Sequence, residues 1–234
     1  MLQKVQFPKL TRKKIAINVV TLAALLLMLL SLMQQKAAPP EDPDWTAPLV
    51  MRGGDPYIRA LMRTISASEA KDRAPYTVLY GGQHFTDLSK HPNQCITIVS
   101  GLHKGECTTA AGRYQLLSTT WNEKVQKYHP KHNQQLLKTV SQTFEPKQQD
   151  AVVYAWLSDR SAWVIDIPNE LKEGNINEVL KHLSITWTSL GYGIETNSIT
   201  PQLPRIYQKA LAEELALAKP SASSDITRIH DRKL

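Results

Sequence analysis

The carboxyl group of Glu69 is the side chain that the sequence places best for acid–base chemistry. A start at Asp55 and Pro56, followed by apolar residues at i, i+3, i+4 and i+7, predicts a helix over 55–70, with the stripe Ile58, Leu61, Met62 and Ile65. Glu69 continues this stripe near the C-terminal end of the helix. Partial burial and the negative end of the helix dipole would both raise its pKa, as a general acid near neutral pH requires. The alternative is a frayed last turn, with Glu69 rotated into water.

Two cysteines, Cys95 and Cys107, are the other groups with distinctive chemistry. They flank a glycine-containing turn region, and in the topology inferred below they lie outside the cytoplasm, where thiols oxidise, so we favour a disulfide. Free thiols are one alternative. The other is a zinc site completed by His91 and His103, although neither His-x3-Cys spacing matches a tight zinc motif. The usual hydrolase, nucleotide-binding and metalloprotease motifs are absent from the sequence, and we expect no metal and no cofactor.

The positive charge of the chain is concentrated at its N-terminus. Five of the seven net charges lie in residues 1–14, so the remainder has a net charge of only +2 and no basic stripe that would indicate nucleic-acid binding. Residues 15–33 carry no charged side chain and are long enough to span a hydrocarbon core of about 30 Å. The basic flank predicts a single-pass anchor in the inner membrane, with the rest facing the periplasm or cell wall. A cleaved signal peptide is the alternative.

Composition divides the remaining chain into three parts. Residues 34–54 contain four prolines and end in two glycines, which predicts a semi-extended linker. Residues 55–217 form the folded domain, and the serine-rich residues 218–234 form a disordered tail. Apolar spacing within the domain predicts helices over 146–160, 176–190 and 203–217. Short β-prone pieces predict an antiparallel hairpin from 76–80 and 95–99. The fold class is therefore α+β, a mostly helical domain with a small hairpin lobe, preceded by one transmembrane helix.

Four blocks of sequence keep a common order along this domain. They are G-G-Q-H-F-T-D-L-S-K-H-P at 81–92, A-G-R-Y-Q-L-L-S at 111–118, P-K-Q-Q-D-A-V at 146–152 and W-T-S-L-G-Y-G at 187–193. The first resembles the G-G-x-x-F-T-D-x-S-x-H-P segment of the phage lambda type endolysins. The others are similar to their A-G-R-Y-Q-L-L-S segment, their P-K-x-Q-D-A-V helix start and their W-x-S-L and G-Y-G pieces. Ser68 and Glu69 fall where that family has its catalytic S-E, and the resemblance covers about 60–215.

The resemblance implies a lysozyme-like fold and a lytic transglycosylase that acts on peptidoglycan glycan strands. Such enzymes cut the MurNAc–GlcNAc β-1,4 bond and leave a 1,6-anhydro-muramyl end. By position, Glu69 would protonate the glycosidic oxygen and then take the proton of the muramyl C6 hydroxyl. Four residues would line the saccharide groove at the start of a helix, or close it from the opposite lobe: Gly112, Tyr114, Gln115 and Tyr192. Their alternative is packing between lobes, and Arg113 would pair with a peptide-stem carboxylate or be solvated.

Two departures from the family leave alternatives open. The phage enzymes are mostly soluble, whereas this chain has a predicted anchor. Where lambda-type members can have an acid between the S-E and G-G segments, this chain has Thr77, which disfavours hydrolysis because hydrolases usually need two carboxylates. Asp87 is the acid nearby that would assist a muramidase by holding water, although a turn cap is its simpler role. A membrane-anchored, non-catalytic peptidoglycan-binding module is the third hypothesis.

Overall fold

A computed structural model of the chain describes residues 42–101, 103–128, 143–195 and 197–219. The predicted basic tail 1–14, the predicted anchor 15–33 and most of the predicted linker lie outside these residues, as does most of the predicted tail 218–234. Among the described residues, no helix combines the length and the apolar character needed to cross a membrane. The described helices and strands all belong to a unit that begins at Asp44.

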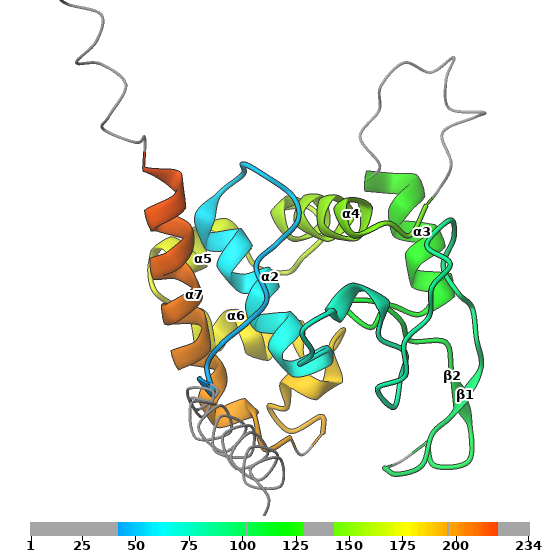
Figure 1. The fold of residues 1–234 in the computed structure, drawn as a ribbon. Coiled ribbons are helices and arrows are strands. Elements are labelled where there is room, and N and C mark those ends of the chain that lie inside the picture. Colours follow the sequence, from blue (N-terminus) through cyan, green and yellow to red (C-terminus); the bar gives the residue numbers. More distant parts are fainter. Residues whose placement is uncertain (1–41, 102, 129–142, 196, 220–234) are drawn as a thin grey trace, which may run out of the picture. The chain divides into compact units, whose positions relative to one another are not determined.

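Helix α2 (Pro56–Glu69) is the element against which several of the others pack (Figure 1). The Asp55 carboxylate accepts a hydrogen bond from Tyr57 N at 2.8 Å, and Pro56 occupies the first turn, so the predicted helix start is confirmed. The predicted apolar stripe is buried, with exposures of 1% or less for Ile58, Leu61, Met62 and Ile65. The helix ends at Glu69, which places the candidate acid at its C-terminal end.

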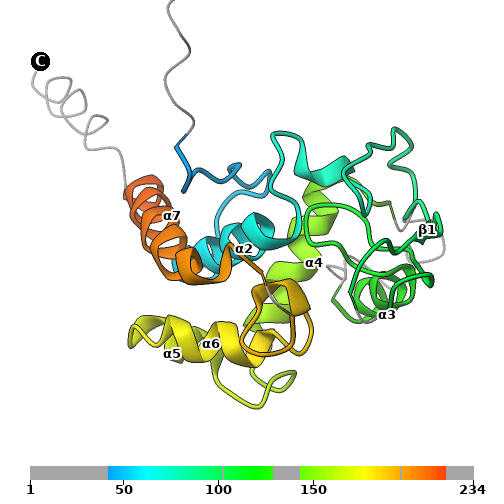
Figure 2. The same cartoon turned by 90° about the horizontal axis from the view of Figure 1, so that it is seen from below.

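The other α-helices of the described residues are α3 (Ser118–Tyr128), α4 (Pro146–Ser158), α5 (Ile167–Lys172), α6 (Ile176–Leu183) and α7 (Leu203–Ala218). Helix α7 lies beside α2, and α4 and α5 also contact α2 (Figure 2). Apolar side chains from all six helices share one hydrophobic core. The predicted helices over 146–160 and 203–217 are therefore confirmed. The bounds of α3 and α5 were not predicted from the sequence.

The predicted helix over 176–190 is wrong in its second half, because α6 ends at Leu183. The Ser184 hydroxyl bonds to the carbonyl oxygen of Lys181 at 2.6 Å, in competition with the helical pattern. The chain then turns and forms a short 3-10 helix, η2 (Thr188–Leu190). Trp187 is only 3% exposed even though it lies outside the helix, so its apolar spacing reflected burial rather than a continuous helix.

The hairpin is shorter than predicted and is built from β1 (Ile96–Thr97) and β2 (Cys107–Thr108), which pair antiparallel. Cys95 and Cys107 are joined by a disulfide, with their Cα atoms 5.4 Å apart, so the favoured pairing is confirmed. Residues 76–80 do not form a regular strand. They begin in the 3-10 helix η1 (Pro75–Thr77), where Pro75 favours a turn, and continue with isolated bridges.

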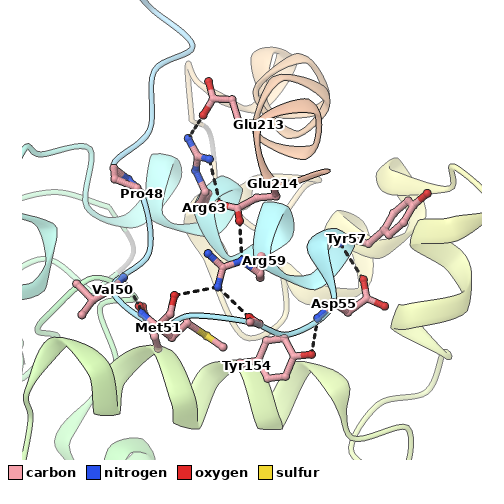
Figure 3. Close-up of polar contacts among 12 residues, drawn as sticks. Pro48, Val50, Met51, Asp55, Tyr57, Arg59, Arg63, Tyr154, Glu213 and Glu214 are labelled. Atoms are coloured by element: carbon pink, nitrogen blue, oxygen red, sulfur yellow. Dashed lines mark hydrogen bonds and ion pairs between the residues drawn. The ribbon is translucent and has the colours of Figure 1, made fainter. Parts of the chain in front are cut away.

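Residues 44–54, predicted as part of a linker, belong instead to the folded unit, and we call them the N-terminal strap (Figure 3). Several of its residues are 9% exposed or less, namely Thr46, Ala47 and Leu49. The fully buried Arg113 guanidinium donates to Ala47 O at 2.5 Å and to Pro48 O at 2.9 Å. The strap therefore supplies backbone acceptors to a charged group in the interior.

Asp150 of α4 binds the same strap through its carboxylate. The backbone N–H groups of Val50 and Met51 donate to Asp150 Oδ2 at 2.8 and 3.0 Å. The hydroxyl groups of Tyr76 and Tyr114 also donate to Asp150, at 2.8 and 2.7 Å. Because these partners lie up to 100 residues apart in the sequence, the proline-rich composition of the strap gave no sign of them.

Two buried arginines of α2 connect the strap with α7 (Figure 3). Arg59 Nε lies 2.6 Å from Glu214 Oε2, and Arg63 Nη1 lies 3.1 Å from Glu214 Oε1. The same arginines donate to the strap, Arg59 to Met51 O at 3.0 Å and Arg63 to Thr46 O at 3.0 Å. The ion pairs and hydrogen bonds of Arg59 and Arg63 therefore hold α2, the helix that ends in Glu69, to both the strap and α7.

Candidate active site

Glu69 is half-buried at the last position of α2. Within the described residues, the hydroxyl of Ser189 donates a short hydrogen bond to Glu69 Oε1. Loss of hydration raises the pKa of Glu69 to about 7, against the lowering effect of the Ser189 hydrogen bond and with a further rise from the charge of Glu195. At neutral pH such a carboxyl group is populated in both forms, so it can give a proton and take one back.

Ser189 is itself fixed by two neighbouring side chains. The Ser68 hydroxyl lies 2.7 Å from Ser189 O and 2.8 Å from Ser189 Oγ. The amide of Asn197 donates to Ser189 O at 2.7 Å. These contacts join the end of α2 to η2 and to the turn that follows it, and they orient the hydroxyl that binds Glu69.

A second acidic residue, Glu195, lies close to this arrangement. The Thr188 hydroxyl donates to Glu195 Oε1 at 2.6 Å, and Thr188 directly precedes Ser189 in η2. Ser189, Asn197 and Glu195 are not among the site residues predicted from the sequence. The W-T-S-L block marked the neighbourhood, but no local spacing shows that Ser189 returns to a carboxyl group 120 residues earlier.

Two residues of the A-G-R-Y block lie in the interior. Tyr114 is 1% exposed and its hydroxyl donates to Asp150 Oδ1 at 2.7 Å, so the prediction that Tyr114 lines a saccharide groove is wrong. Arg113 is fully buried and bound to the strap, so neither predicted role, a peptide-stem contact or a solvated side chain, is correct. Both side chains form hydrogen bonds inside the domain, so these two residues of the motif have a structural role.

Gly112 and Gln115 shape the turn between these residues and α3. Gly112 has φ +74°, and a Cβ there would lie 2.3 Å from Gln149 Oε1 and 2.8 Å from the Phe144 ring, so glycine is needed for close approach to α4. Gln115 Nε2 donates to Val78 O at 3.0 Å and to Gly112 O at 2.9 Å. The predicted position at a helix start is wrong, since this turn precedes α3, and a saccharide contact by the half-buried Gln115 stays a prediction.

Tyr192 and Asp87 are more accessible. Tyr192 is half-buried, and its hydroxyl donates to Asn177 Oδ1 at 3.2 Å. Asp87 is exposed and accepts a hydrogen bond from Ser89 N at 2.9 Å, which is the turn cap considered above. Hydrogen bonds from Ser89 lower the pKa of Asp87, so this carboxylate is ionised at neutral pH. Saccharide contacts by both residues stay predictions.

Comparisons with known proteins agree with this architecture. The family model described as Endolysin matches residues 59–213. The endolysin of Escherichia phage lambda is 36% identical over 122 residues, a match that spans 50% of this chain and 64% of that protein, less than two thirds of its length. A solved structure of bacteriophage lambda lysozyme complexed with a chitohexasaccharide has a TM-score of 0.50 and 27% identity, and the match covers 68% of this chain and 97% of that one.

The family match covers more than half of the chain, and it begins after the strap and includes Glu69, Ser189 and Glu195. The fold shared with lambda lysozyme consists mostly of helices with a small antiparallel sheet. The resemblance drawn from the four sequence blocks is thus confirmed, and the chain belongs to the endolysin family.

Proposed function

We propose that this chain is a peptidoglycan-cleaving enzyme that breaks the MurNAc–GlcNAc β-1,4 bond as a lytic transglycosylase. The observation that carries the proposal is Glu69, a half-buried carboxyl group whose pKa is raised to about 7 by loss of hydration. Membership of the endolysin family, and the chitohexasaccharide bound by the lambda relative, support a glycan as the substrate.

The reaction needs one residue that acts first as acid and then as base. Protonated Glu69 gives its proton to the glycosidic oxygen while the bond from that oxygen to C1 breaks, and positive charge develops on the muramyl ring. The Glu69 carboxylate then removes the proton of the C6 hydroxyl as its oxygen bonds to C1. The proton returns to Glu69 and no water is consumed, so the product carries a 1,6-anhydro end.

A muramidase is the second candidate, with Asp87 holding the attacking water. The position of Asp87 supports this role less well, because the carboxylate is exposed and already caps the turn at Ser89. A non-catalytic peptidoglycan-binding module is the third candidate. A binding module has no use for a carboxyl group poised to exchange a proton at neutral pH, which favours the enzymatic candidates.

We further propose that the enzyme is a single-pass protein of the inner membrane, anchored by residues 15–33, with its folded unit in the periplasm or facing the cell wall. The basic residues at 1–14 and the uncharged apolar run support this orientation. The disulfide between Cys95 and Cys107 is in keeping with an oxidising compartment.

The test is mass spectrometry of the muropeptides that the full-length chain releases from purified peptidoglycan. Transglycosylation predicts anhydro-ended products, and Glu69→Gln should lower their rate of release by about 10²–10⁴-fold. Glu123→Gln is the matched control, because Glu123 is an exposed residue of α3 paired with Lys124. Reducing ends would assign hydrolysis, and equal release by the wild type and Glu69→Gln would reject Glu69 as the acid.

A further inference from the structure

Two carboxyl groups from distant parts of the chain are held by consecutive residues of η2. Ser189 donates to Glu69 Oε1, and Thr188 donates to Glu195 Oε1 at 2.6 Å. Because Thr188 and Ser189 are neighbours in one short 3-10 helix, the position of one carboxyl group is tied to that of the other. Glu195 is exposed, but its hydrogen bond restricts where its charge lies.

The turn that carries Glu195 is joined to η2 by side chains that follow Glu195 in the chain. Gly191 has φ +89°, and a Cβ there would lie 2.3 Å from Thr200 Oγ1, so the turn depends on glycine at this position. The Asn197 amide donates to Ser189 O at 2.7 Å, and the Thr200 hydroxyl donates to Leu190 O at 3.0 Å. These contacts tie the turn that carries Glu195 to η2, the element whose Ser189 also binds Glu69.

The end of α2 has other charged groups nearby, but the charge that raises the pKa of Glu69 is that of Glu195. Lys71 and Asp72 follow the helix in the chain, and Asp72 Oδ2 lies 3.5 Å from His84 Nε2. The charge that contributes to the raised pKa of Glu69 is that of Glu195. A negative charge beside a carboxyl group favours its neutral form, which is the form a general acid needs.

We propose that Glu195 is the second acidic residue of the reaction centre, a positioning residue whose carboxylate, oriented by Thr188, keeps the transferable proton on Glu69. This inference rests on the proposed function, in which the first step requires protonated Glu69. It assigns to Glu195 an electrostatic role and not that of a nucleophile or of a base for water. The second carboxylate of this family member thus comes from the turn after η2, not from the segment that contains Asp87.

The experiment measures kcat/KM for muropeptide release by the full-length chain between pH 5 and pH 9. Removing the negative charge in Glu195→Gln should move the alkaline limb to lower pH by about 0.5 unit, which is about a threefold loss at pH 8 with little change at pH 5. Thr188→Val should cause part of this shift, and adding it to Glu195→Gln should cause no more. Glu195→Asp keeps the charge and should restore at least half of the shift, whereas Glu123→Gln should leave the limb in place.

An alkaline limb that is identical in Glu195→Gln and in the wild type would overturn the inference. Equal loss at every pH would also overturn it, because a merely structural role lowers the rate without moving the limb. If the wild type releases no products, the proposed function fails, and ¹³C NMR titration of the Glu69 carboxyl carbon then tests the inference separately. A midpoint lower by about 0.5 unit in Glu195→Gln supports the inference, and an unchanged midpoint rejects it.

Discussion

The N-terminal strap and the C-terminal end of α2 both remove carboxyl groups from water, but they provide them with different partners. At the strap, Asp150 accepts hydrogen bonds from two backbone N–H groups and two tyrosine hydroxyls, and Glu214 binds two arginines. At the end of α2, the described residues offer Glu69 one hydroxyl, that of Ser189. The domain therefore holds well-paired charges at one place and a poorly paired carboxyl group at another.

This difference separates structural from chemical carboxyl groups. A buried carboxylate with several donors is stabilised in its charged form and is costly to leave unpaired. A carboxyl group whose loss of hydration outweighs its single hydrogen bond favours its neutral form, and for Glu69 the pKa rises to about 7. The strap fixes α2 through Arg59 and Arg63, so the well-paired region supports the helix that holds the poorly paired group.

The largest expected effect comes from removing the strap. A chain that begins at residue 44 should fold as the full chain does, whereas one that begins at residue 55 should not fold stably. The second removes the backbone partners of Arg113 and Asp150, and weaker pairing of these buried charges costs several kcal/mol out of a total stability of about 5–15 kcal/mol. Circular dichroism melting of the two shortened chains makes the comparison, and equal melting temperatures would contradict the role given to the strap.

Two adjacent glutamates of α7 provide a matched test of pairing. Glu214→Ala should lower the free energy of unfolding by about 3–5 kcal/mol, because Arg59 and Arg63 then lose a buried partner. Glu213→Ala should lower it by less than about 1 kcal/mol, because that side chain is 44% exposed and its ion pair with Arg63 is open to water. Urea unfolding of both variants measures the difference, and similar losses would mean that burial of the pair is unimportant.

Replacing the poorly paired Glu69 should raise the free energy of unfolding at high pH, whereas replacing the well-paired Glu214 lowers it. The pKa of Glu69 is about 7 in the folded chain against an ordinary value of 4.5, so the folded state binds its proton more tightly. The stability that the folded state gains from binding this proton is fully present below pH 4.5 and is lost as the pH rises through 7. Glu69→Gln should therefore raise the free energy of unfolding by about 3 kcal/mol at pH 8 and change it little at pH 4.

Urea unfolding of the wild type and Glu69→Gln at the two pH values checks this expectation. The same measurements on Glu123→Gln provide the control, because Glu123 is an exposed surface residue. A constant difference between Glu69→Gln and the wild type at pH 4 and pH 8 would show that folding does not disfavour the Glu69 carboxylate.

The smallest expected effect is that of Asp87→Asn, which should change kcat/KM for muropeptide release by about twofold or less. Asp87 is exposed and occupied as a turn cap, so its charge has little to contribute to an electrostatic stabilisation of the reaction. The rate of muropeptide release and the identity of the product ends are the measurements. A loss as large as that of Glu69→Gln, with reducing ends in the wild type, would favour the muramidase.

Local patterns in the sequence were sufficient for α2, for Glu69 at its end and for the disulfide of the hairpin. These features depend on residues close together in the chain, where capping and apolar spacing act directly. The strap, the burial of Tyr114 and the Ser189 contact could not be predicted in the same way, because their partners lie 36 to 120 residues away. The strap in particular has the composition of a linker, and only its distant buried partners make it part of the fold.

The central claim is that folding leaves Glu69 poorly paired and holds its pKa near neutrality. ¹³C NMR titration of the glutamate side-chain carboxyl carbons in the full-length chain tests it directly, with Glu69→Gln used to assign the resonance. We expect a midpoint of about 7 for Glu69. A midpoint near the ordinary value of 4.5 would contradict the account, because Glu69 would then be fully ionised at neutral pH and have no proton to give.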